Sequence, residues 1–96
     1  MSARITVNIN AGGVFEIWMN EEGRDLLVRE LQGLSEKNDH LHLMPKLTPK
    51  PMGDIELSSR AYRSDDKILE WGKVLFRPDA WDREYFPHVM HDNLND

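Results

Sequence analysis

Two short segments near the N-terminus alternate between apolar and polar residues with the period of a β-strand. In residues 4–10, Ile5, Val7 and Ile9 alternate with polar side chains, and residues 14–19 repeat this alternation. The sequence between them, Asn-Ala-Gly-Gly, tolerates the positive φ angles of a tight turn. The pattern therefore predicts an antiparallel hairpin.

A helical pattern follows this hairpin. Asn20 is a favourable N-cap residue, and the two glutamates after it suit the positive end of the helix dipole. An apolar stripe with helical spacing comes next, formed by Leu27, Leu31 and Leu34. We therefore expect a helix from Asn20 to about Leu34, with Gly23 weakening it slightly.

Three further strands are predicted, over residues 40–44, 54–58 and 67–77, the last with a bulge at Gly72. A proline-rich loop separates the first two, and residues 59–66 form a turn before the third. Residues 79–85 form a short helical segment, and residues 87–96 are expected to fray. The sum is a single α+β domain over residues 1–96, with a mostly antiparallel five-stranded sheet (ββαβββ) and one main helix on one face.

Composition and charge exclude several classes of function. The chain has 96 residues, 12 basic and 17 acidic, for a net charge of −5, and it contains no cysteine. An acidic surplus opposes phosphate binding, so nucleic acid is not expected as a partner, whereas a basic protein is. Without an apolar segment of about 20 residues, a membrane span is not expected, and we expect a cytoplasmic protein.

The helix should leave one face of the sheet uncovered. Alternation along the strands assigns eight residues to that face, namely Thr6, Asn8, Glu16, Trp18, His40, His42, Glu56 and Glu70. Trp18 is the strongest candidate for an aromatic anchor, because tryptophan in a setting of charge is typical of interface hot spots. Asp65 and Asp66 are expected at the rim of this uncovered face.

Two other groups allow alternative interpretations. His40 and His42 lie two residues apart on a strand, where they could share a metal ion, although no third histidine has a diagnostic spacing. Trp81, Tyr85 and Phe86 could seal the open end of the sheet or form a second aromatic anchor. The sequence contains no glycine elbow around a serine and no phosphate-binding glycine loop, so an enzyme is possible but unsupported, and no cofactor or catalytic residue is assigned.

Three segments of this sequence together resemble a known family. They are Phe15-Glu16-Ile17-Trp18 with the later Gly-Arg-Asp-Leu-Leu, then Asp-His-Leu-His-Leu-Met at residues 39–44, and Ile-Glu-Leu-Ser at residues 55–58. The likeness, over residues 5–76, is to the immunity proteins of bacterial polymorphic toxin systems (family thirty-two). It implies an α+β fold, no enzymatic activity, and a cytoplasmic protein that binds and blocks a cognate toxin.

The first functional prediction is therefore a non-enzymatic immunity protein that blocks a toxin, such as a basic nuclease, through an acidic and aromatic sheet face. Its predicted contact residues are Glu16, Trp18, His40, His42, Glu56, Asp65, Asp66 and Glu70. One alternative is a small metal-dependent hydrolase that uses His40 and His42. A homodimeric structural domain that buries the same face is the other.

Overall fold

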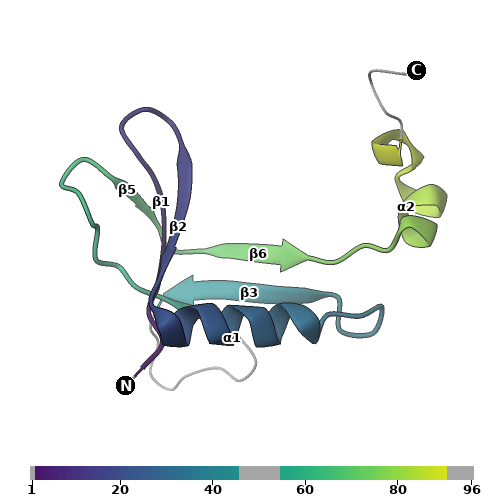
Figure 1. Cartoon of the computed structure of the whole chain (residues 1–96). Coiled ribbons are helices and arrows are strands. Elements are labelled where there is room, and N and C mark those ends of the chain that lie inside the picture. The colour runs from purple at the N-terminus through teal and green to yellow at the C-terminus, as the bar shows by residue number, and fades with distance from the viewer. Residues whose placement is uncertain (1, 46–54, 91–96) are drawn as a thin grey trace.

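The computed structural model describes residues 2–45 and 55–90 (Figure 1). In chain order its elements are β1 (Ile5–Ile9), β2 (Phe15–Met19), α1 (Glu21–Gln32), β3 (His40–Pro45), β4 (Ile55–Leu57), β5 (Lys67–Leu69), β6 (Gly72–Leu75), α2 (Asp79–Tyr85) and the 3-10 helix η1 (Pro87–Met90). The α+β class predicted from the sequence is confirmed. None of the described helices has the length and apolar character that crossing a membrane requires.

The predicted hairpin is present. β1 and β2 pair antiparallel, with Ile5 opposite Met19 and Ile9 opposite Phe15. Asn10 organises the turn, because its Oδ1 accepts hydrogen bonds from the backbone N–H groups of Gly12 (2.9 Å) and residue 14 (3.0 Å). Gly13 has a φ of +83°, which an L side chain rarely adopts. Turn chemistry that is legible in the sequence thus sets the register of this pair.

The predicted N-cap of α1 is also confirmed. The Oδ1 atom of Asn20 accepts hydrogen bonds from the N–H groups of Gly23 (2.7 Å) and Arg4 (2.9 Å). Its amide nitrogen donates to the carbonyl oxygen of Ser2 (3.0 Å). Asn20 therefore ties the start of the helix to the segment that precedes β1.

The strands form two sheets, and the expected single five-stranded sheet is wrong. Sheet A has the order β2-β1-β5 and sheet B the order β4-β3-β6, each with three strands. All pairs are antiparallel except β3–β4, which is parallel. The single strand predicted over residues 67–77 is two strands, because the chain leaves sheet A after Leu69 and enters sheet B at Gly72.

This division explains a pattern that the sequence left ambiguous. As a single strand, residues 67–77 carry apolar side chains on both faces, which a bulge at Gly72 would reconcile. In the structure each half has its own inner face, with Leu69 packing on the core from sheet A and Val74 from sheet B. Two short strands in differently oriented sheets thus replace one bulged strand.

A small core joins the two sheets and α1. Of the described residues, five apolar side chains are buried, namely Ile5, Val7, Leu41, Ile55 and Leu57. Leu27 of α1 and Leu34, two residues beyond its end, pack against them, whereas Leu31 of the expected stripe is exposed. The N–H of Ser58, directly after β4, donates to the carbonyl of Ile5 (2.7 Å) and links the ends of the two sheets. In Figure 1 the hairpin stands across one end of sheet B, and α1 runs beside β3.

The C-terminal part of the described chain stands apart from this core. α2 and η1 lie at the end of β6 that is remote from the hairpin (Figure 1). The predicted short helical segment is therefore confirmed, but its aromatic residues do not seal the sheet. Of the segment expected to fray, residues 87–90 form η1 and residues 91–96 lie outside the described residues, as do residues 46–53 of the predicted loop.

Candidate protein-binding surface

Trp18 lies on the face of sheet A that points away from the core. It is opposite Thr6 in the β1–β2 register, and its indole Nε1 donates a 2.7 Å hydrogen bond to Oδ1 of Asn8. Thr6 and Asn8 are both buried, at 1% and 0% exposure. These polar side chains are therefore covered by neighbours instead of presenting a bare face, and Trp18 is half-buried.

The residue that covers Trp18 is Tyr62, from the turn between β4 and β5. The two rings stack with centroids 4.0 Å apart and planes 11° apart, and the guanidinium of Arg63 lies 5.1 Å from the indole centroid. Tyr62 remains 48% exposed. An incoming protein would therefore meet the tyrosine ring first, supported from behind by the tryptophan.

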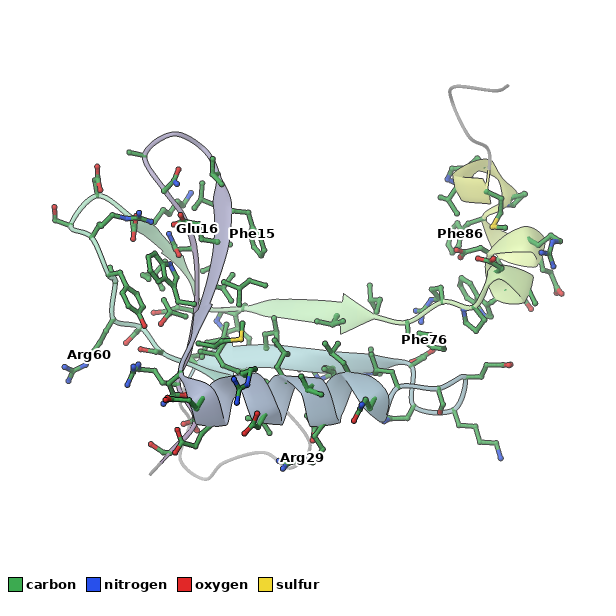
Figure 2. The ribbon with its side chains drawn as sticks, in the orientation of Figure 1. Phe15, Glu16, Arg29, Arg60, Phe76 and Phe86 are labelled. Atoms are coloured by element: carbon green, nitrogen blue, oxygen red, sulfur yellow. The ribbon has the colours of Figure 1, made fainter. Side chains whose placement is uncertain are left out.

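A charged network holds this turn over the sheet. Arg63 forms ion pairs with Glu16 and with Asp66, whose carboxylate lies 3.1 Å from the Arg63 Nε and has no exposed surface. Glu16 also accepts hydrogen bonds from the side-chain amides of Asn8 (3.1 Å) and Asn10 (3.3 Å). Glu16 projects from one side of β2 and Phe15 from the other (Figure 2). The two carboxylates thus fix the position of Arg63, and with it Tyr62.

The electrostatics of Arg63 agree with this structural role. Partial burial lowers the pKa of its guanidinium, but the hydrogen bond to Asp66 and the charges of Asp66 and Glu16 outweigh that effect. The pKa of Arg63 is consequently raised above its usual value. The guanidinium of Arg63 therefore carries its positive charge throughout the neutral pH range.

One hollow adjoins the stacked rings, and a second adjoins the first. The first is lined by Thr6 and Tyr62 together with Arg4, Ser58 and Arg60. The second shares the last three residues and also contains both Glu56 and Glu70. The shared lining makes the surface continuous from Tyr62 to the two glutamates. We call this surface the Tyr62 face, and its main members are Glu16, Trp18, Glu56, Arg60, Tyr62 and Glu70.

The predicted contact residues separate into two groups. Glu16, Trp18, Glu56 and Glu70 belong to the Tyr62 face, and Asp65 is exposed in the turn beside it. Asp66, expected at an open rim, instead has its carboxylate covered in the pair with Arg63. The histidines lie on the outer face of sheet B, which also carries Glu56, but they line neither hollow. His40 is opposite Leu75, and His42 is opposite Lys73.

The two imidazoles contact each other, with ring centroids 4.9 Å apart in an edge-on arrangement. Nδ1 of His40 lies 2.8 Å from Oδ1 of Asp39, and Nη1 of Arg77 lies 3.1 Å from Oδ2 of the same carboxylate. Within residues 2–45 and 55–90, no three His, Cys, Asp or Glu side chains are grouped so that they could hold a metal ion. The carboxylate of Asp39 therefore pairs with both His40 and Arg77, and these contacts fix the start of β3.

This arrangement predicts a pH dependence of stability. The hydrogen bond with His40 lowers the pKa of Asp39 below its ordinary value of 3.8, and the charges of Arg77 and His40 add to this against an opposing effect of burial. A depressed pKa stabilises the fold fully above the pKa of the unfolded chain, about 4, and this stabilisation is lost as the pH falls through the folded-state value. Unfolding measured from neutral pH downward should show Asp39→Asn less stable than the wild type above about pH 4, with the difference closing below it. A difference independent of pH would contradict this assignment.

Sequence reasoning missed the residues that complete the Tyr62 face. Tyr62, Arg63 and Arg60 lie in a segment that reads only as a turn, and their approach to β2 depends on how the chain crosses between the two sheets. Arg60 extends away from the turn (Figure 2). The surface is therefore mixed in charge, with arginines among its carboxylates, whereas alternation predicts a face of carboxylates, imidazoles and a tryptophan without arginines.

Comparisons with protein-family models, with curated proteins and with solved structures found no match to this chain.

Proposed function

We propose that this chain is a non-enzymatic immunity protein that binds a cognate bacterial toxin in the cytoplasm and blocks it through the Tyr62 face. The observation that carries the proposal is the stack of Tyr62 on Trp18, a half-exposed aromatic ring on a fixed support with hollows beside it. A ring held in place before binding loses little conformational entropy in the complex. Such rings are the typical anchors of protein interfaces.

The family resemblance supports the same proposal. Its first segment ends on Trp18, and its last segment, residues 55–58, contains Glu56 and Ser58 of the second hollow. Two separate parts of the resemblance thus meet on one surface. The histidine segment lies on sheet B and contributes no residue that lines these two hollows.

The charges of the Tyr62 face favour a basic partner. Glu56 and Glu70 line one hollow, Asp65 is exposed nearby, and the whole chain carries a net charge of −5. A field of this sign steers a basic protein toward the surface and raises the association rate. Toxins that cleave nucleic acid are basic because they must hold phosphate. Arg4 and Arg60 would meet carboxylates of the toxin near the same contacts.

A growth assay tests the proposal. The C-terminal domain of the protein encoded beside this gene would be expressed in bacteria with and without this chain. We expect the domain alone to stop growth and the pair to grow, with a complex that survives purification. A domain that is toxic in both cultures, or that shows no association with the chain, would contradict the proposal.

Tyr62→Ala tests the surface itself. We expect this variant to bind the toxin domain more weakly by about 2 kcal/mol, because the anchor ring is removed. Phe15→Ala is the matched control, since Phe15 is a comparably exposed ring (57%) on the opposite face of the same sheet. Titration calorimetry should separate the two variants, and equal affinities would remove the Tyr62 face from the interface.

A further inference from the structure

The C-terminal elements α2 and η1, here called the arm, carry an apolar cluster without a core to pack on. Trp81 contacts Tyr85 (centroids 4.8 Å apart) and Phe86 (5.3 Å) within the arm. None of the residues of α2 and η1, all of which the structure describes, is buried, and Val89 and Tyr85 are more than half exposed. A helix of seven residues is marginal in water unless its apolar side packs against another surface.

The junction between β6 and the arm directs the arm away from its own body. Arg77 is paired with the Asp39 carboxylate (3.1 Å), and its guanidinium lies 4.7 Å from the ring centroid of Trp81. The N–H of Phe76 donates to the carbonyl of Asp39 (2.7 Å), and Pro78 has its φ fixed at −61°. The radius of gyration is accordingly 16.0 Å, against about 12.5 Å for a compact chain of this length.

An apolar hollow lies at the other end of β6. It has a volume of about 430 Å³ and is lined by His42, Leu43, Met44, Trp71, Gly72 and Lys73. Trp71 is 66% exposed, and the lining is mainly apolar with the ammonium of Lys73 at its edge. We call it the Trp71 hollow. Since the arm begins beyond the opposite end of the strand (Figure 1), it does not reach the hollow of its own chain.

We propose that two copies of this chain exchange arms, so that the aromatic cluster of each arm docks in the Trp71 hollow of the other copy. β6 is an edge strand of sheet B. A twofold axis beside the middle of β6 makes the two β6 strands antiparallel, and this brings the end of one strand next to the start of the other. Each arm then lies beside the partner's hollow, and both contacts form together.

Charge complementarity supports the same occupant. α2 carries Asp79, Asp82 and Glu84 against a single basic residue, Arg83. The charged residue of the Trp71 hollow is Lys73, a cation. An acidic arm around an aromatic cluster thus matches an apolar hollow with a basic edge. This inference does not depend on the proposed function, because the stacked rings of the Tyr62 face belong to sheet A and its turn.

Sedimentation velocity of the full chain tests the exchange over about 1 to 100 μM, because dimer population depends on protomer concentration. We expect a monomer–dimer equilibrium, and we expect Trp81→Ala to raise the dissociation constant about thirtyfold, as the loss of a central aromatic does. Val28→Ala is the control, since Val28 is an exposed apolar residue of α1 outside both the arm and the hollow. It should leave the dissociation constant unchanged.

A charge exchange keeps the test decisive if Trp81→Ala also unfolds the arm. Lys73→Glu and the double variant Asp82→Lys/Glu84→Lys should each dimerise more weakly than the wild type. An equimolar mixture of the two should form heterodimers, because each arm then faces a hollow of opposite charge. A chain that is monomeric at every concentration would overturn the proposal, whether its arm is open or folded back. A dimer that is insensitive to all these variants would also overturn it, as would a mixture without heterodimers.

Discussion

Replacement of Asn8 by alanine should lower the free energy of unfolding by about 3 kcal/mol, because it creates a cavity and leaves buried partners without hydrogen bonds. Asn8 has no exposed surface. Its side-chain oxygen Oδ1 accepts a hydrogen bond from the Trp18 indole at 2.7 Å, and its side-chain nitrogen Nδ2 donates one to Glu16 at 3.1 Å. Both partners belong to the Tyr62 face, so the buried side chain of Asn8 fixes the orientation of Trp18 and Glu16. Denaturant unfolding measures the change.

Thr6 supplies the matched control for this prediction. It precedes Asn8 by two residues on the same strand face and is 1% exposed, but its hydroxyl has no hydrogen-bond partner among the described residues. Thr6→Val keeps the shape and removes an unsatisfied polar group, so it should be neutral or stabilising. If Asn8→Ala and Thr6→Val had equal effects, burial alone and not the hydrogen-bond network would account for the stability.

Gly23→Ala should destabilise the protein by about 3 kcal/mol, the upper part of the usual range for overpacking. A Cβ atom at this position would lie 2.5 Å from the carbonyl oxygen of Arg4 and 3.0 Å from the Ile5 side chain. The first of these is a backbone atom, so the helix or the segment before β1 must move. That movement would disturb the Asn20 cap, whose oxygen would be 3.1 Å from the new atom.

Helix propensity alone predicts that Gly23→Ala stabilises the protein, since alanine is favoured over glycine by about 1 kcal/mol in a helix. Gly33→Ala isolates that effect. At Gly33, which follows α1 with a φ of −81°, the nearest atom to an added Cβ is 3.5 Å away. Gly33→Ala should therefore be neutral or slightly stabilising. If Gly23→Ala raised the melting temperature, the segment before β1 would lie farther from the helix than the 2.5 Å distance to the Arg4 carbonyl oxygen implies.

Local patterns in the sequence predicted the local structure well. The Asn10 turn and the Asn20 cap depend on neighbouring residues, and each is found where the pattern placed it. The leucine stripe is confirmed only in part, because Leu27 packs on the core, Leu34 packs from beyond the end of α1, and Leu31 is 42% exposed. The alternation also placed His40, His42 and Glu56 on one face of sheet B, as the β3–β4 and β3–β6 registers confirm. Gly23 is an exception, because its close contact is with a residue outside the helix.

The arrangement of the two sheets could not be predicted in this way. Strand periodicity says which side chains share a face, but it does not say where the chain passes from one sheet to another. The chain passes from sheet A to sheet B through α1, between β2 and β3, and this divides the expected face, with Trp18 on sheet A and the histidines on sheet B. The return to sheet A through residues 58–66, between β4 and β5, brings Tyr62 onto Trp18, a contact between residues 44 positions apart. The candidate site thus depends on long-range geometry.

Amide hydrogen exchange of the full chain, with and without the toxin domain identified by the growth assay, tests the proposed function most directly. We predict that binding slows exchange in residues 58–66 and at the edge of β2, where the stacked rings and hollows lie. Exchange in β6 and at His40 and His42 of β3 should change little. Unchanged exchange in residues 58–66 together with protection elsewhere would contradict the Tyr62 face as the toxin-binding surface.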